Sequence, residues 1–489
     1  MKKSINLLAI CFALSGAFRA SGQQAPQAFS LQQSISYALQ NRPNLKANQN
    51  EEKIAKARVG EIRAMGLPQI DIAADVSNNF IQQKTLLDPS GFAGPELDPF
   101  VITPEQLNGQ QPIVLTPAYS DRELPENTPL QVITFTQPYT GSIGINGSQL
   151  LFDGSYLIGL KAAKTYTELS RKTTAQTEID IAEQVSKAYY SVLVSGARMA
   201  LLDQNLVRLD TLLYQTKVMF ENGVAEKLDV DRLQVSLNNL KVEKQKAERL
   251  AALSESLLKF QMGLPQRQPI LLTDKLAEVQ VDIATINTND FNYNSRIEYS
   301  ILETQRDLAD LDMRNKRSGY LPKLYLTARY GYNGVGSSLS DVLNVRAGAN
   351  NNIDRNWFDF GFVGVQLQVP VFDGLRKHYQ IQQARLAVEN AKYGFETIRQ
   401  SIDLELVQAT TELTNALDVL DSQQENLALA QEIARVTKIK FQEGVGANLE
   451  VVTAETELRQ AQTNYYAAMY DALIAKVNLD KATGKLLTK

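Results

Sequence analysis

Three short motifs occur twice in this chain of 489 residues, in the same order each time. They are Leu-Pro (67–68 and 321–322), Phe-Asp-Gly (152–154 and 372–374) and Phe-x-x-Gly-Val (220–224 and 441–445). A repeated order of motifs indicates that each half folds as one copy of the same plan. We therefore expect a tandem duplication, with a first structural repeat over 23–273 and a second over 274–489.

The first half carries an insertion between its first two motifs. The spacing between them is about 34 residues longer than in the second half, and residues 81–138 hold nine of the sixteen prolines. Proline lacks a backbone N–H and interrupts helices and central strands. The stretch 81–138 is expected to be a long loop.

The N-terminus has the pattern of a signal peptide over residues 1–22. A short basic start is followed by the mostly apolar run 5–18 and by small residues at 20–22, suited to cleavage before Gln23. Cys11, the one cysteine of the sequence, lies in the apolar run and would leave with the peptide. A lipoprotein with Cys11 as its lipidated residue is the less favoured alternative.

Each half contains two segments with the alternation of amphipathic strands. We expect strands at about 68–80 and 139–153 in the first half, and at about 321–333 and 358–372 in the second. One face of the first strand carries Ile70, Ile72, Ala74 and Val76, and the other carries Asp71, Ala73, Asp75 and Ser77. Aromatic residues crowd the second pair: Tyr320, Tyr325, Tyr330, Tyr332, Trp357, Phe358, Phe360 and Phe362.

The helical segments are of coiled-coil length. No proline interrupts the pattern between residues 155 and 221 or between 375 and 442, and at ~1.5 Å per residue each stretch spans roughly 100 Å. Helical hairpins are expected at 155–262 and 375–483, and a shorter helix at 290–318. Apolar residues rich in alanine repeat every three or four positions from Ala447 to Ala482, which predicts close packing of helix against helix. A solvated linker helix is the alternative.

Composition removes most enzyme classes. With one cysteine and one histidine, the chain has no zinc cluster of these residues and no Cys–His catalytic pair. A formal net charge of −4 argues against nucleic acid as a partner. We expect a protein that is not an enzyme, with no cofactor and no metal.

Four strands per chain are too few for a membrane barrel. Strands of ~9–11 residues can span an outer membrane, and single-chain bacterial barrels have at least about eight of them. A sheet in lipid must close on itself, because an open edge leaves backbone groups without partners. Several chains must then share one barrel, and three copies would supply twelve strands. A soluble four-stranded sheet beside a helical bundle is the alternative.

The ordered set of motifs resembles the TolC family of outer-membrane efflux proteins. It comprises Ala38–Leu45, Gly66–Pro68, the Phe-Asp-Gly motifs and the turns 220–225 and 441–446. The resemblance implies an α+β membrane protein: a homotrimeric twelve-stranded β-barrel continued by a periplasmic α-helical coiled-coil barrel. It further implies an equatorial belt built from segments such as 264–290 and the end of the chain. It also implies a passive exit duct in the outer membrane lipid that opens on engaging a periplasmic adaptor and an inner-membrane pump of the RND or ABC type.

The turns between the long helices carry the candidate site residues. Glycines at the two turns suit helix C-termini in the left-handed conformation. The resemblance implies that the turn apices are adaptor-docking tips, formed by Gly223, Val224, Ala225, Gly444, Val445 and Gly446.

The resemblance also implies an acidic aperture at these turns, lined by Glu450 and, through the repeat, by Asp229, with Asp231 nearby. Rings of carboxylates favour the passage of cations. Thr453 and Arg232 stand where a second acid often occurs in the family, so the aperture would be less acidic. The alternative reading is that Asp229 and Glu450 are solvated acids that favour a helix N-terminus.

Two other functions remain open from the sequence. A general diffusion porin would have no need of ~100 Å helices. A trimeric coiled-coil adhesin or spacer would typically run in one direction, whereas these helices return as hairpins.

Overall fold

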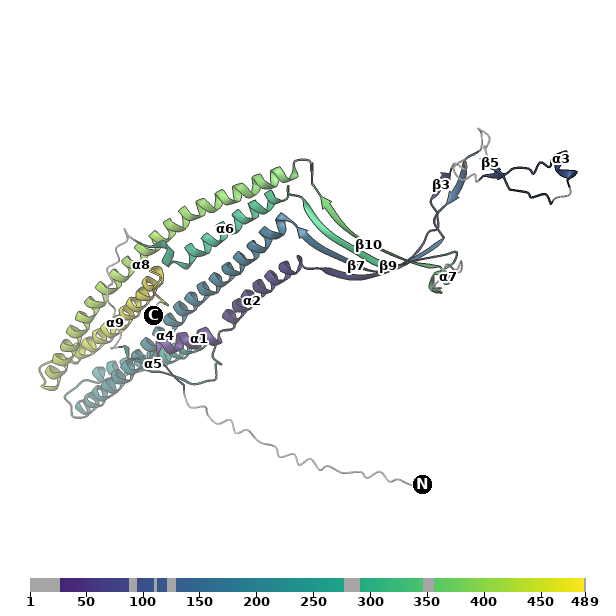
Figure 1. Cartoon of the computed structure of the whole chain (residues 1–489). Helices are drawn as coiled ribbons and strands as arrows, with labels where there is room; N and C mark the ends of the chain where they lie inside the picture. The colour runs from purple at the N-terminus through teal and green to yellow at the C-terminus, as the bar shows by residue number, and fades with distance from the viewer. Residues whose placement is uncertain are drawn as a thin grey trace, which may run out of the picture. The chain divides into compact units, whose positions relative to one another are not determined.

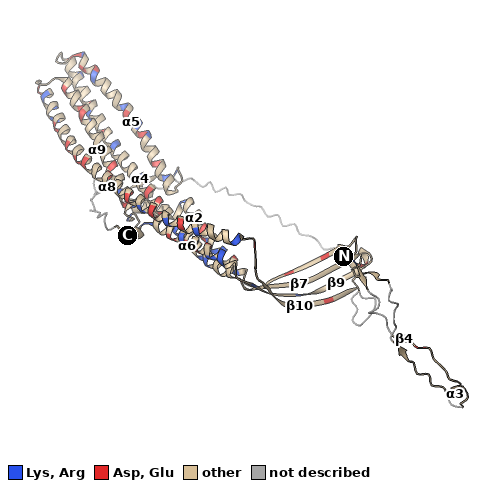
Figure 2. Cartoon of the chain, turned by 90° about the horizontal axis from the view of Figure 1, so that it is seen from above, with Lys and Arg blue, Asp and Glu red and all other residues tan. Residues whose placement is uncertain are grey.

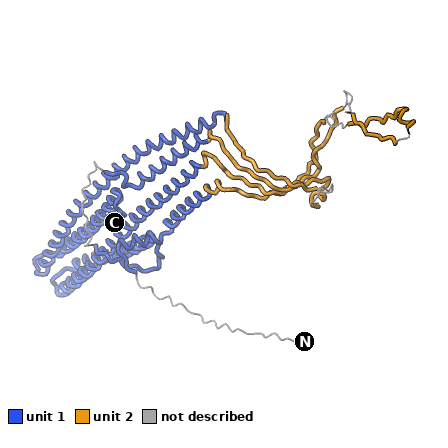
Figure 3. The backbone as a smooth tube through the Cα atoms, in the orientation of Figure 1, with its two compact units in different colours: residues 1–62, 157–318, 374–489 blue, residues 63–156, 319–373 orange. Residues whose placement is uncertain are grey.

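The computed structural model describes residues 27–87, 95–109, 112–120, 129–276, 291–345 and 356–487. The expected signal peptide, including Cys11, and part of the expected belt segment lie outside the described residues. The chain divides into two compact units, which Figure 3 colours separately. The first unit comprises 1–62, 157–318 and 374–489, and the second comprises 63–156 and 319–373.

Long helices make up the first unit (Figure 1). They are α1 (Leu31–Asn41), α2 (Pro43–Ala64), α4 (Gly154–Glu221), α5 (Lys227–Met262), α6 (Ile297–Ser318), α8 (Arg376–Gln442) and α9 (Asn448–Ala482), with a 3₁₀ turn at Tyr293–Ser295 before α6. Helices α4 and α8 run for 68 and 67 residues, as the absence of proline predicts. No helix in the described part of the chain is long and apolar enough to cross a membrane.

The predicted alanine-rich seam of α9 is largely buried. Its buried members are Val451, Ala454, Leu458, Ala468, Ala472, Ala475, Leu479 and Ala482. Two of the apolar clusters that they form include residues of α8, among them Leu406, Leu413 and Ala434. Small side chains let the helix backbones approach closely. Figure 2 shows that acidic and basic residues are distributed along the helices.

A further apolar cluster surrounds a two-stranded parallel sheet of β1 (Gln27–Phe29) and β8 (Ile270–Leu272). The phenol of Tyr189 in α4 is fully buried there and donates to the carbonyl of Phe29 at 3.2 Å. This cluster joins the chain's first described residues to α4, α5 and the last turns of α9.

The second unit is built on a four-stranded antiparallel sheet. Its spatial order is β10 (Trp357–Gln368), β9 (Lys323–Gly336), β7 (Tyr139–Phe152) and β2 (Gln69–Asn78). The two strand pairs expected from the sequence are thus one sheet, because β7 pairs with β9. Strand β10 stops short of the expected residue 372, since Pro370 has no N–H to donate to a ladder.

The register separates the sheet into an apolar and a polar face. Ile72 stands opposite Ile145, which stands opposite Tyr330 on the next strand. In the same way Asp71 stands opposite Asn146, which stands opposite Arg329. Successive side chains on a strand point to opposite faces. In β2, β7 and β9 one face is therefore mainly apolar, and the other carries amides, hydroxyls and charges. Strand β10 departs from this pattern, since it places Phe358, Phe360 and Phe362 on the polar face and Asp359 opposite Tyr332 on the apolar face.

The expected loop 81–138 contains some regular structure. Its described parts form two short antiparallel ladders, β3 (Lys84–Leu87) with β6 (Gln131–Thr134) and β4 (Glu96–Leu97) with β5 (Tyr119–Ser120). A single turn of helix, α3 (Pro104–Leu107), lies between them in sequence. The insertion is an extended arm of hairpin type, and the proline count alone did not predict these ladders.

Candidate functional site

The turn between α4 and α5 is a Schellman motif. Gly223 has a φ of 77°, and its N–H donates to Phe220 at 3.0 Å. The next N–H, of Val224, donates to the carbonyl of Met219 at 2.8 Å. These two bonds satisfy carbonyls that the end of a helix leaves without partners. The side chain of Val224 is 76% exposed.

The turn between α8 and α9 repeats this geometry. Gly444 also has a φ of 77° and donates to Phe441 at 3.1 Å, and Val445 donates to the carbonyl of Lys440 at 3.0 Å. Val445 is 77% exposed. The prediction that Gly223 and Gly444 end their helices in the left-handed conformation is confirmed, and each turn presents one valine to solvent.

Gly446 and Ala225 occupy equivalent positions after these valines but differ in space. A Cβ at Gly446 would lie 3.0 Å from the Cβ of Lys440. Ala225 is half-buried and donates its N–H to Met219 at 3.3 Å. A side chain at Gly446 would therefore crowd the last turn of α8.

The acidic candidates at the turns have different surroundings. Asp229 accepts a hydrogen bond from the N–H of Glu226 at 3.4 Å and lies 3.7 Å from the guanidinium of Arg232. Its carboxylate thus closes the N-terminus of its own helix. Asp231 is exposed.

Glu450 lies in the first turn of α9 and is exposed. Among the described residues, its carboxylate has no hydrogen bond or ion pair. A carboxylate without a partner is available to an ion or to another chain, whereas that of Asp229 is already engaged. The structure therefore distinguishes two acids that the repeat treats as equivalent.

A buried contact between polar side chains joins α4 to α9. The guanidinium Nε of Arg208 lies 3.0 Å from the carboxylate of Glu455, which is almost fully buried. Arg208 also donates to Asn205, which donates in turn to Gln462 at 2.8 Å. The sequence did not single out these residues, because nothing local in it indicates which helix faces meet.

A second charged cluster joins α4 to the end of α9. Lys481 lies 3.0 Å from Asp180 and 2.7 Å from Glu183, and Lys187 lies 2.6 Å from Glu183. Burial opposes the charged form of Glu183, but the hydrogen bonds from both lysines outweigh it and lower its pKa. Burial likewise opposes the charge of Lys481, but the two carboxylates raise its pKa.

Arg296, just before α6, ties that helix to α8 and α9. Its guanidinium is 5% exposed and donates to Glu298 at 3.0 Å, to Glu405 at 2.8 Å and to the carbonyl of Ala482 at 2.8 Å. These donations tie the start of α6 to the middle of α8 and to the end of α9, so the first unit is stabilised by charge as well as by apolar packing.

The polar face of the sheet carries its own network. Asn146 donates to Asp71 at 2.9 Å, and Ser142 donates to Asp75. The guanidinium of Arg329 lies 5.0 Å from the ring centre of Phe360, a cation–π contact. Strand alternation places Phe360 on the polar face, away from Tyr330 and Tyr332, so the aromatic residues are divided between the two faces.

No group of three or more histidine, cysteine or acidic side chains in the described residues has the arrangement of a metal site.

The molecule thus combines long helical hairpins with a two-faced sheet, the architecture of an outer membrane channel. Solved structures share this fold. A crystal structure of CusC aligns with a TM-score of 0.68 at 16% identity, over 93% of this chain and 92% of that one. The open state of the Neisseria gonorrhoeae MtrE outer membrane channel aligns with a TM-score of 0.67 at 14% identity, over 93% and 88%.

Sequence comparison gives the family. The family described as "Outer membrane efflux protein" matches residues 34–264 and 301–485. The chain belongs to this family and is an outer-membrane protein of the TolC type. It is 23% identical over 346 residues to the outer membrane protein TolC of Vibrio cholerae, covering 71% of this chain and 77% of that protein.

Proposed function

We propose that three copies of this chain share one twelve-stranded barrel. The edges of the sheet support this. The strands at the ends of the sheet, β2 and β10, each pair on one side only within the described residues. An open edge is not stable in lipid, and β2 of one copy joined to β10 of the next removes every edge.

The protein acts as a passive exit duct of a tripartite efflux or secretion system. The barrel continues into the periplasm as a coiled-coil barrel built by the hairpins of three copies. It opens at the two turns when a periplasmic adaptor and an inner-membrane pump, of the RND or ABC type, engage it. Membership of the efflux family and the two helical hairpins support this assignment.

At the turns, we assign docking to the six apex residues, led by the exposed Val224 and Val445, and the aperture to Glu450. Three copies of Glu450 form an acidic ring that favours cations over anions. Asp229 contributes less, because its carboxylate is engaged in its own turn. Asp231 lies nearby and is the third candidate for the aperture.

The organisation of the chain follows from a duplication. Residues 1–22 are a signal peptide, and the repeats cover 23–273 and 274–489. In support, α2, β2, β7, α4 and α5 follow the same order as α6, β9, β10, α8 and α9. The paired helices also match closely in length, with 22 and 22, 68 and 67, and 36 and 35 residues.

The proposal is tested by the native mass of the protein extracted in detergent from the outer-membrane fraction. A species of three chains is expected, and a soluble monomer would overturn the shared barrel. Because Cys11 is the one cysteine of the sequence, pairs of cysteines, one on β2 and one on β10 of the same chain, can then be scanned for disulfides between chains. We expect them between β2 and β10 and not between β7 and β9, which already pair within one chain.

A further inference from the structure

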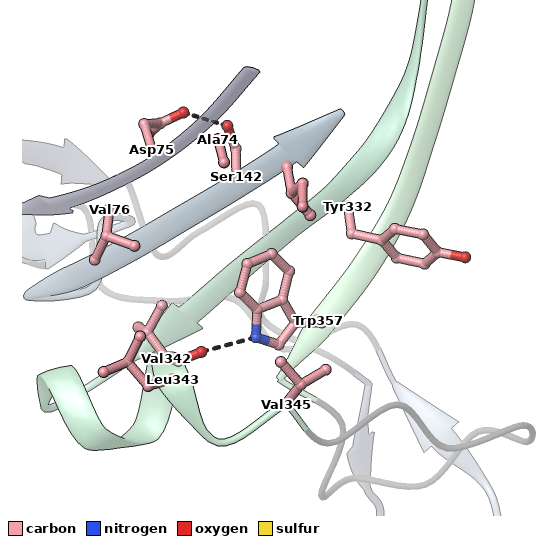
Figure 4. A pocket seen from close by; sticks show the side chains of 10 residues that line it. Ala74, Asp75, Val76, Ser142, Tyr332, Val342, Leu343, Val345 and Trp357 are labelled. Carbon is pink, nitrogen blue, oxygen red and sulfur yellow. Dashed lines mark hydrogen bonds between the residues drawn. The ribbon is translucent and has the colours of Figure 1, made fainter. Parts of the chain in front are cut away.

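A pocket lies at the end of the sheet where β9 leads into the short helix α7 (Leu339–Leu343). Its volume is about 540 Å³, within the ~300–1,000 Å³ range of small-molecule sites. The lining consists of Ala74, Asp75, Val76, Ser142, Ile143, Tyr332, Val342, Leu343, Val345 and Trp357, all in the second unit (Figure 4).

Trp357 forms one wall, fixed by glycines and by one hydrogen bond. Its indole N–H donates to the carbonyl of Val342 at 3.0 Å, and the ring is 8% exposed. A Cβ at Gly334 would overlap this ring, and one at Gly141 would lie 2.8 Å from Val342 and 3.1 Å from the ring. The two glycines therefore leave the space that the indole and α7 occupy.

The pocket opens on the apolar face of the sheet. By register, Trp357 stands opposite Gly334, which stands opposite Gly141 and in turn Val76. Ile143 and Tyr332 also stand opposite each other on this face. Asp75 and Ser142 bond to each other on the opposite face, away from Trp357 (Figure 4).

Several lining side chains remain open to solvent in the single chain. Leu343 is 65% exposed and Val345 is 60% exposed, although Val342 beside them is 1% exposed. Burying apolar surface of this kind is favourable by roughly 25 cal/mol per Å². The lining contains no lysine or arginine to hold a phosphate.

We propose that this pocket binds an acyl chain of a membrane lipid. The inference rests on the proposed barrel, in which the apolar face of the sheet contacts hydrocarbon and the pocket is continuous with that face. Tryptophan and tyrosine are enriched where a barrel meets the membrane surface, which places Trp357 and Tyr332 at the level where a chain enters the bilayer. The occupant is recognised by its hydrocarbon and not by its headgroup.

The test uses the full-length protein in vesicles of phosphatidylethanolamine and phosphatidylglycerol. These vesicles contain a phospholipid with a diazirine at the end of one acyl chain or, in a parallel sample, on its headgroup. After irradiation, labelled peptides are mapped by mass spectrometry. The acyl probe is expected to label the peptides that carry Val342–Val345 and Trp357 more than other peptides of the apolar face.

Three variants test the site. Ala74→Trp fills the pocket, and its labelling is expected to fall about tenfold, equivalent to ~1.4 kcal/mol of binding. Ile70→Trp is the matched control, on the same strand and face but outside the lining, and is expected to label as wild type. Leu343→Asn lowers the affinity from the helix side, without a change in any strand.

Equal labelling of wild type and Ala74→Trp would overturn the site. The site would also be overturned if the acyl probe labelled the rest of the apolar face but not the pocket lining. That result would mean that protein, and not lipid, fills the pocket. Stronger labelling by the headgroup probe would overturn the assignment to an acyl chain. The native mass is measured on the same samples. A monomer whose pocket is still labelled would contradict the proposed duct and leave the lipid site standing.

Discussion

Asn205 and Gln462 are 257 residues apart in the sequence, yet Asn205 Nδ2 donates to Gln462 Oε1 at 2.8 Å. Both side chains are almost fully buried, at 3% and 5% exposure. The bond joins α4, in one proposed repeat, to α9 in the other. Loss of Gln462 would leave the buried Nδ2 of Asn205 without its acceptor, and loss of Asn205 would leave Gln462 Oε1 without its donor, each at a cost in folding free energy.

Removal of either partner is therefore expected to destabilise the helical unit by about 1–3 kcal/mol. In the double variant Asn205→Leu/Gln462→Leu the loss should be smaller than the sum of the single losses, since no unpaired amide remains. The apparent melting temperature by circular dichroism measures this. Gln460→Leu is the control, because Gln460 bonds to Asn464 on the exposed face of the same helix and should change little. Additive losses would contradict the coupling.

The left-handed glycines give a second prediction. Gly223→Ala and Gly444→Ala each place a Cβ at a φ of 77°, which costs about 1–2 kcal/mol. Amide hydrogen exchange at Val224 and Val445 should become faster, since these N–H groups close the turns. Gly60→Ala is the matched control: it lies within α2 with open space around it, and alanine there should be neutral or stabilising. Unchanged exchange in both turn variants would argue against the Schellman geometry.

The charged cluster at Lys481 predicts a pH dependence. The pKa of Glu183 is lowered, so its contribution to stability is complete above its ordinary pKa of 4.5 and is lost as the pH falls through the lowered value. Lys481→Met should lower stability near neutral pH by about 1.5–3 kcal/mol, and the difference from wild type should shrink below pH 4.5. Melting curves across pH measure both.

Lys316→Met removes a comparable charge from an exposed pair with Asp312, at 3.6 Å on α6, and should have little effect at any pH. If the loss of stability in Lys481→Met does not vary with pH, Lys481 stabilises the protein by packing and not by its charge.

The sequence predicted those features that depend on local chemistry. Proline-free stretches gave the long helices, and Gly223 and Gly444 gave the turns. Strand alternation assigned Ile72 and Asp71 to opposite faces. It did not reveal that β7 pairs with β9, because the partner of a strand distant in sequence is not encoded locally. For the same reason the sequence did not predict the Asn205–Gln462 bond or the stacking of Arg329 on Phe360.

The sequence motif alone also did not distinguish the two acidic candidates at the turns. Asp229 and Glu450 occupy equivalent positions of the repeat, but Arg232 and the N–H of Glu226 engage the first. The second turn has Thr453 in place of that arginine, so Glu450 lacks the cation that lies beside Asp229. The difference in availability therefore comes at least from this neighbour, which the repeat does not preserve.

The docking role of the apices predicts a selective loss of assembly. Val224→Asp and Val445→Asp together should abolish cross-linking of the purified trimer to its periplasmic adaptor. Each places a charge where the exposed valine would be desolvated by the partner. Val207→Asp is the control, on α4 and 69% exposed, and should retain cross-linking. The amount of each variant in the outer membrane should match that of wild type. If the apex variant still cross-links to the adaptor, the adaptor does not dock at these turns.

The aperture assignment predicts how ion selectivity divides between the two turns. In planar bilayers, Glu450→Gln should reduce the preference for cations, because it removes three unengaged carboxylates from the constriction. Asp229→Asn should have a smaller effect, since that carboxylate is already paired with its own helix end. Asp471→Asn, exposed further along α9, is the control and should leave the reversal potential unchanged. If Glu450→Gln leaves both selectivity and conductance as in wild type, Glu450 does not line the aperture.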